Sequence, residues 1–272
     1  MGSSSTPARL ILASICASLL MIAYSKLHAA DPKLKAKHGV AKIRAAKPDN
    51  VVESGAAVVI YMDNDKIYMI TAYHVIDDAD SIEVRFSELP TKRFSGSIFE
   101  KYDGERDLGI IYVDAKKMPN QIIIPLKIAD PSKTSELEKI IAVGHPRGRE
   151  WELSSGEIRS TDRAFLRFSG DAVSPGNSGG ALLNDEYKLI GIVTKEETDQ
   201  GIAVRIDEAF KILDQWKLPH YAIPKGNKKW LWIVAGAAGA AGGIAAVLLK
   251  PETASQVEVE FPAPPGRPPV RY

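Results

Sequence analysis

The chain has 272 residues, of which 45% are hydrophobic and 25% are charged. This length and composition are typical of a globular protein of one or two domains with a substantial hydrophobic core. The formal net charge is only +1, and the lysines and arginines are spread along the chain apart from a short cluster at 225–229, so no nucleic-acid partner is expected.

Residues 1–30 are predicted to be a signal peptide. Arg9 supplies the positive start, the apolar run 10–24 is short for a membrane span, and small residues lead to a cleavage site after Ala30. An uncleaved signal anchor is the alternative. The one cysteine, Cys16, lies in this run, so the cleaved protein would have no disulfide and no cysteine nucleophile. A cysteine-free exported domain indicates a bacterial cell envelope protein located in the periplasm.

The segment 31–220 is predicted to be one domain built of strands, because short β-branched and aromatic runs alternate with turns from Val40 to Leu218. The first set of predicted strands is 56–62, 66–71, 81–86, 94–99, 108–113 and 122–128. The second set is 140–143, 157–160, 164–168, 181–183, 189–194 and 201–204.

One stretch in this domain, 207–216, has helical periodicity. Two groups of about six strands, separated near residues 130–132, followed by one helix, predict an all-β fold of two packed antiparallel barrels with a C-terminal helix.

A short basic linker, 221–229, precedes a second apolar segment. Residues 230–249 carry no charge and match the roughly 20 residues that span a bilayer, with Trp230 at one end and Lys250 at the other. We predict a transmembrane helix, whose recurring glycines would allow helix-mediated oligomerisation. A buried Ala/Gly helix of a soluble domain is the alternative. The linker lysines would lie outside in an exported protein, against the positive-inside tendency.

The tail 250–272 is rich in proline. It is compatible with a polyproline-like extension or a ligand for a partner, and the Val-Glu alternation at 256–261 is also compatible with an edge strand. The sequence leaves these alternatives open.

The loop 174–180, Ser-Pro-Gly-Asn-Ser-Gly-Gly, is a candidate catalytic loop. Glycines on both sides of Ser178 permit a tight backbone in which consecutive N–H groups point into one concavity, beside a nucleophilic hydroxyl. An ordinary turn is the alternative, since all four residue types favour turns.

A serine hydroxyl needs a base to become nucleophilic. Of the histidines that follow the predicted signal peptide, His74 ends an apolar strand and begins a loop, which suits a position in a cleft. A core histidine is the alternative. His145 precedes a proline in a turn and is interpreted as structural, and His38 and His220 flank the domain.

The base in turn needs an orienting carboxylate. Asp107 directly precedes the apolar strand 108–113, so its carboxylate should be partly buried and should require a partner such as an imidazole N–H. The alternative is a turn aspartate that continues the polar run 103–106.

Together the three residues occur in the order His, Asp, Ser, which is that of the chymotrypsin type. Thr71-Ala72-Tyr73-His74, Asp107-Leu108-Gly109-Ile110 and Gly176-Asn177-Ser178-Gly179-Gly180 resemble the three motifs of trypsin-like serine proteases. Asp171-Ala172-Val173-Ser174-Pro175 and Gly144-His145-Pro146 resemble the HtrA-type (Deg-like) branch.

The resemblance implies two six-stranded barrels with the active site between them. His74 and Asp107 would lie on the first barrel, and Ser178 on the second. Ser178 would attack a peptide carbonyl while His74 accepts its proton and Asp107 orients the ring. The oxyanion hole is expected at Gly176, Asn177 and Ser178, with the N–H groups of Gly176 and Ser178 as donors. The expected chemistry requires no metal and no cofactor.

The resemblance covers about 40–216 and also implies substrate-binding positions. Ala172 would form the base of the primary pocket, which favours a small or medium apolar side chain. Thr194 and Lys195 would line either the pocket wall or the substrate strand. The expected substrates are proteins or peptides of the envelope. HtrA-type proteins usually carry a PDZ domain after the protease, and none is expected in this chain.

Two other functions stay open at this point. The chain is also compatible with a catalytically silent or zymogen-like binding module tethered to a membrane. It is further compatible with a membrane-assembly protein whose Gly-rich helix, 230–249, is the functional part.

Overall fold

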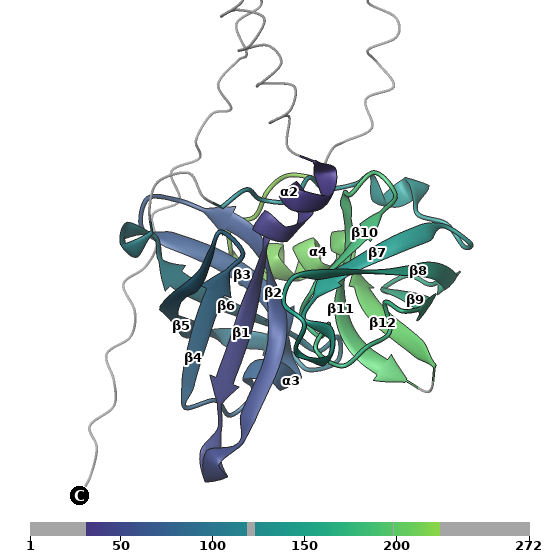
Figure 1. Ribbon diagram of the computed structural model, residues 1–272. Helices are drawn as coiled ribbons and strands as arrows, with labels where there is room; N and C mark the ends of the chain where they lie inside the picture. The colour runs from purple at the N-terminus through teal and green to yellow at the C-terminus, as the bar shows by residue number, and fades with distance from the viewer. Residues whose placement is uncertain (1–30, 119–122, 198, 224–272) are drawn as a thin grey trace, which may run out of the picture. The chain divides into compact units, whose positions relative to one another are not determined.

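The computed structural model describes residues 31–118, 123–197 and 199–223 (Figure 1). The predicted signal peptide, the transmembrane helix, the Pro-rich tail and the linker beyond residue 223 lie outside the described residues. Among the helices of the described part, none has the length and apolar composition needed to cross a membrane.

The strands of the described residues form two closed antiparallel barrels, as predicted (Figure 1). The first contains β1 (Val40–Ala46), β2 (Val52–Met62), β3 (Lys66–Ala72), β4 (Ser81–Phe86), β5 (Leu89–Asp103) and β6 (Leu108–Asp114), in the order β1-β2-β3-β6-β5-β4. The second contains β7 (Lys139–Gly144), β8 (Glu152–Thr161), β9 (Phe165–Gly170), β10 (Ala181–Asn184), β11 (Leu189–Glu197) and β12 (Gln200–Arg205), in the order β10-β11-β12-β9-β8-β7.

Three α-helices accompany the barrels in the described part: α2 (Pro32–His38), α3 (Tyr73–Ile76) and α4 (Ile206–Trp216). Four short 3₁₀ turns complete it: η1 (Pro48–Asn50), η2 (Ala115–Lys117), η3 (Pro131–Lys133) and η4 (Pro146–Gly148). The predicted C-terminal helix is α4. The predicted division near 130–132 is also confirmed, because η3 lies between the last strand of the first barrel and the first strand of the second.

Alternating side chains fill each barrel, as a period of two residues requires. In β4, for example, Ile82, Val84 and Phe86 are buried while their neighbours are not. A further apolar cluster joins both barrels to α4, with Val58, Ile192 and Leu213 among its members. The barrels therefore share a hydrophobic interface.

The predicted strand 122–128 is wrong. Residues 123–127 belong to no strand, and Ile128 forms only an isolated bridge with Leu189. Ile123, Leu126 and Ile128 are nevertheless buried, so the apolar pattern indicated burial correctly but not the secondary structure. Pro125 has no N–H to donate to a ladder, which disfavours a strand at this position.

The sixth strand of the first barrel is instead β1, which pairs with β2 and with β4 and so closes the barrel. Several strands are also longer than predicted. β5 extends on both sides of 94–99, and most of its added residues are exposed, so they carry no apolar alternation.

The core of the second barrel provides a test of this packing. Phe168 is fully buried, and its ring occupies the space that Gly201 leaves: a Cβ at Gly201 would lie 2.2 Å from the ring. We expect Phe168→Ala to lower the free energy of unfolding by about 3–5 kcal/mol through the cavity that it creates. Leu137→Ala, at a residue that is 72% exposed, should change it by no more than about 0.5 kcal/mol. Urea denaturation measures both, and equal effects would contradict the described core.

Candidate active site

His74 lies at the end of the first barrel, in the single turn of α3 that follows β3. Its ring Nδ1 is 2.7 Å from Oδ2 of Asp107, and its backbone N–H donates to Oδ1 of the same carboxylate at 2.9 Å. The Asp107 side chain is 7% exposed, whereas that of His74 is 44% exposed. The carboxylate is thus buried behind a ring whose outer part faces solvent.

Strand pairing brings these two residues together. β3 and β6 are antiparallel and align Ala72 with Leu108, so Asp107 and His74 stand just beyond the paired ends. The N–H of Tyr73 donates to the Asp107 carbonyl at 3.0 Å, which extends the pairing by one bond. Asp107 adopts φ +55°, and this left-handed turn accompanies the two bonds from its carboxylate to His74.

Ser178 belongs to the second barrel but is bonded to the first. Its carbonyl accepts the N–H of Ala56, in β2, at 2.8 Å. Gly179 has φ +79°, and a Cβ there would lie 2.0 Å from the Ala56 carbonyl and 2.3 Å from Oγ1 of Thr71. The serine backbone therefore sits against the strands that lead to His74. Within the described residues, no hydrogen bond joins the Ser178 hydroxyl to the His74 ring.

Between Pro175 and Gly180, two N–H groups have no backbone acceptor in the described part of the chain, those of Gly176 and Ser178. The Pro175 carbonyl accepts the N–H of Arg147 at 3.0 Å, and the Gly176 carbonyl accepts that of His145 at 3.1 Å. Because a trans peptide directs its C=O and N–H to opposite sides, the first bond turns the Gly176 N–H away from residue 147.

Asn177 differs from Gly176 and Ser178 because its N–H groups have acceptors within the described residues. Its N–H donates to the Ser174 carbonyl at 3.1 Å, and its buried side chain donates from Nδ2 to the Ala172 carbonyl at 2.9 Å. Its Oδ1 is buried, and no partner for it is found among the described residues. Asn177 is thus buried, and its backbone N–H and its side-chain amide are both bonded within the second barrel.

The three predicted substrate-binding residues differ in exposure. Ala172 is fully buried and packs with the core of the second barrel. Thr194 is 1% exposed and lies at a bulge of β11, whereas Lys195 is exposed. Val193 accepts the N–H of Gly179 at 2.7 Å and donates to the Gly180 carbonyl at 2.9 Å. These bonds hold Thr194 and Lys195 beside the serine loop.

Sequence reasoning missed one part of this site. His145 is indeed buried, but it also belongs to the loop that bonds the backbone around Gly176. Trp151, which was not singled out, donates its N–H to Nδ1 of His145 at 3.1 Å. A histidine followed six residues later by a tryptophan is the only signal the sequence offered. Within the described segments, no group of three or more His, Cys, Asp and Glu side chains is arranged to hold a metal ion.

Comparison with known proteins agrees with this geometry. The family described as "Trypsin-like peptidase domain" matches residues 55–192, about half of the chain. The chain belongs to this family. A probable periplasmic serine endoprotease DegP-like of Hahella chejuensis is 29% identical over 192 residues, which cover 64% of the chain and 38% of the relative. A serine protease Do-like HtrA of Lactobacillus helveticus is 31% identical over 149 residues, or 51% of the chain and 34% of the relative.

These relatives confirm the resemblance of this trypsin-like peptidase domain to the HtrA-type branch, although the chain spans less than half of their length. Among solved structures, the serine endoprotease of Yersinia pestis has a TM-score of 0.55 at 24% identity, covering 67% of this chain and 65% of that one. The HtrA-type protease AlgW with a tripeptide has a TM-score of 0.57 at 24% identity, covering 67% and 62%. These two structures share the fold.

Two glycines of this peptidase domain form a matched pair. Gly176 has φ +94° and Gly148 has φ +82°, but a Cβ at 176 would lie 2.4 Å from the His145 carbonyl, whereas one at 148 meets nothing within 4 Å. Gly148→Ala should lower the free energy of unfolding by about 1–2 kcal/mol through backbone strain alone. We expect Gly176→Ala to lower the free energy of unfolding by clearly more than Gly148→Ala, because the loop around residue 176 must also move away from the His145 carbonyl. Urea denaturation measures both, and equal costs would contradict the close approach.

His145 predicts a pH dependence of stability. Burial is the main cause that lowers its pKa from 6.5 to about 4; among nearby charges, Lys42 and Arg85 lower the pKa further and Glu150 raises it. As the pH falls, the unfolded chain protonates this histidine before the folded protein does. The free energy of unfolding therefore decreases by about 3 kcal/mol between pH 6.5 and about pH 4.

His145→Asn removes the titrating group, so its stability should fall less than that of the wild type over this range. Urea denaturation between pH 7 and pH 4 measures the difference. Parallel pH profiles for the two proteins would contradict a buried, neutral His145.

Proposed function

We propose that this protein is a serine endopeptidase in which Ser178 is the nucleophile, His74 the base and Asp107 the residue that orients the base. The observation that carries the proposal is the two-point contact of Asp107 with His74, through the ring at 2.7 Å and the backbone N–H at 2.9 Å. A buried carboxylate that holds an imidazole in this way, beside a Gly-Asn-Ser-Gly-Gly loop, is the arrangement that acyl transfer requires.

In the proposed mechanism, the Nδ1–H of His74 donates to Asp107, which leaves Nε2 free to accept a proton. The Ser178 oxygen attacks the peptide carbonyl and passes its proton to Nε2, and the resulting imidazolium is stabilised by the carboxylate. The ring then gives this proton to the leaving amine. Water releases the acyl group by the same steps, with His74 again as the base.

The negative charge on the carbonyl oxygen of the intermediate requires donors that are already in place. The N–H groups of Gly176 and Ser178 are proposed to be these donors, supported by the lack of a backbone acceptor for either among the described residues. Removal of one such donor typically costs about 3 kcal/mol of transition-state stabilisation. Asn177 would keep the two donors at the correct spacing.

The proposed substrates are proteins or peptides of the bacterial cell envelope. The names of the curated relatives support this compartment, since several of them are described as periplasmic endoproteases. Ala172 carries no charge and would favour a small or medium apolar residue before the scissile bond. Lys195, exposed on β11 beside the serine loop, would interact with the substrate strand. The membrane tether predicted at 230–249 stays a prediction.

A second candidate function is a silent or zymogen-like binding module. The observation that favours it is that the Ser178 hydroxyl has no hydrogen bond to the His74 ring in the described part of the chain. Catalytic hydrogen bonds are often longer in unliganded enzymes and tighten with substrate, so reactivity of Ser178 distinguishes the two functions.

A fluorophosphonate probe tests the proposal directly, because it reacts only with an activated serine. We expect the wild type to be labelled and Ser178→Ala to remain unlabelled. Asp107→Asn, which keeps the shape of the side chain but favours the wrong tautomer, should lower the rate of peptide hydrolysis by about 10⁴. A folded wild type that reacts with neither probe nor peptide library would overturn the peptidase proposal and favour the binding module.

A further inference from the structure

The loop 145–151, here called the bridge loop, leads from β7 to β8 of the second barrel. On one side its backbone bonds to the loop 174–180, which holds the proposed oxyanion donors. The N–H of His145 donates to the Gly176 carbonyl at 3.1 Å, and the N–H of Arg147 donates to the Pro175 carbonyl at 3.0 Å. These bonds hold both carbonyls that flank the Gly176 N–H, so the bridge loop determines the direction of that donor.

On its other side the bridge loop is bonded to the first barrel, at the start of β1. The indole N–H of Trp151 donates to the Val40 carbonyl at 2.8 Å, and Nε2 of His145 lies 3.5 Å from the Ala41 carbonyl. The two rings meet edge to face, with centroids 5.2 Å apart. Both side chains are buried, so these contacts are shielded from water.

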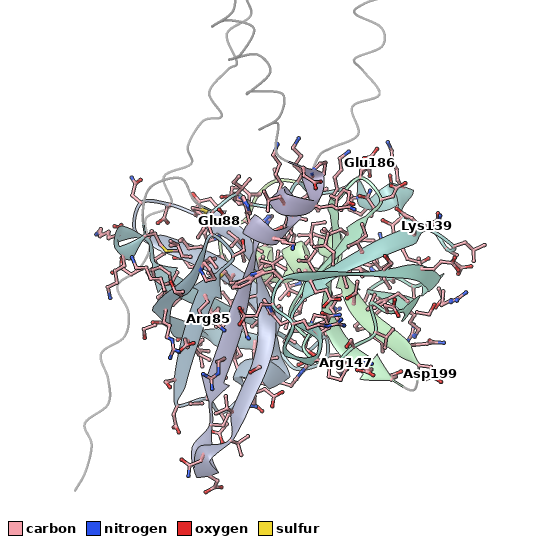
Figure 2. The ribbon with its side chains drawn as sticks, in the orientation of Figure 1. Arg85, Glu88, Lys139, Arg147, Glu186 and Asp199 are labelled. Atoms are coloured by element: carbon pink, nitrogen blue, oxygen red, sulfur yellow. The ribbon has the colours of Figure 1, made fainter. Side chains whose placement is uncertain are left out.

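Charged side chains reinforce this second attachment. The Glu150 carboxylate contacts Lys42 of β1 at 2.7 Å and Arg85 of β4 at 2.5 Å. Figure 2 labels Arg85 on the first-barrel side and Arg147 in the bridge loop. The loop thus reaches across from its own barrel to two strands of the other.

The backbone of the bridge loop is strained where these attachments are made. Arg147 has φ +50° and Trp151 has φ +49°, values that side chains other than glycine seldom adopt. Such conformations persist only where surrounding contacts enforce them. The attachments at both ends supply that enforcement, which makes the loop a defined spacer rather than an adaptable one.

We propose that the bridge loop positions the oxyanion donors of the second barrel relative to the base of the first, with His145 and Trp151 as positioning residues. His145 is central because its backbone N–H holds the Gly176 carbonyl while its ring accepts the Trp151 N–H. Because Trp151 is anchored on β1, the geometry of the first barrel is transmitted to the Gly176 N–H. This inference rests on the proposed peptidase function, whose oxyanion site it deepens.

The test measures fluorophosphonate labelling of the full chain over a range of probe concentrations, which separates reversible binding (KI) from the bond-forming step (kinact). His145→Ala removes the acceptor for the Trp151 N–H and should lower kinact by about 10² with KI unchanged, as expected when an oxyanion donor is displaced. His145→Asn supplies an amide oxygen in place of Nδ1 and should restore most of kinact. Trp151→Phe, a milder change that keeps a ring, should lower kinact by about 10-fold.

Arg149→Ala is the matched control. Arg149 lies in the same loop, but its ion pair at 2.7 Å is with Glu152 of the same barrel, and among the described residues its side chain has no polar contact with the first barrel. Its kinact should equal that of the wild type. A purely structural role for His145 and Trp151 would lower the free energy of unfolding of their variants while kinact of the folded protein stayed at the wild-type value. That result would overturn the proposal.

A second measurement keeps this test separate from that of the peptidase function. Hydrogen exchange of the backbone amides of 174–180 should be faster in His145→Ala and Trp151→Phe than in the wild type and in Arg149→Ala. If the probe does not label the wild type at all, the proposed peptidase function is wrong. Hydrogen exchange alone then decides whether the bridge loop positions the backbone of 174–180. Unchanged exchange in both variants would overturn the proposal whatever the activity.

Discussion

The site depends on contact between two separately closed barrels, because the imidazole and its carboxylate belong to one and the serine loop to the other. The hydrogen bond from the Ala56 N–H to the Ser178 carbonyl joins them at the serine itself. The absence of a side chain at Gly179 permits it, since a Cβ there would collide with the Ala56 carbonyl. The apolar cluster shared by both barrels and α4 provides the free energy that holds these polar contacts in register.

Within the first barrel, one antiparallel register accounts for the pairing of His74 with Asp107. The ladder between β3 and β6 ends where Ala72 meets Leu108, and the chain on each side turns at once. The carboxylate then accepts two bonds from His74, which compensates for its burial. Two residues 33 positions apart are thereby brought into direct contact.

The bridge loop assigns a further role to β1. This strand closes the first barrel by pairing with β2 and β4, and its carbonyls at Val40 and Ala41 face the buried rings of the bridge loop. Under our proposal, barrel closure and the orientation of the loop 174–180 thus depend on the same few residues. The apolar pattern missed β1 and selected 122–128 instead, because Ile123 and Leu126 are buried without pairing in a ladder.

The sequence by itself determined the all-β class, the two groups of strands, the helix α4 and the identity of His74, Asp107 and Ser178 as candidates. Alternation and short motifs are local properties that a single chain displays. Only the tertiary structure decided which strand closes the first barrel, that the Asn177 side chain is buried and bonded to Ala172, and that His145 and Trp151 link the barrels. Two of these features arise from pairing between separate elements of the chain: β1 pairs with β4, and Trp151 bonds to Val40, 111 positions away. No local pattern encodes such pairings.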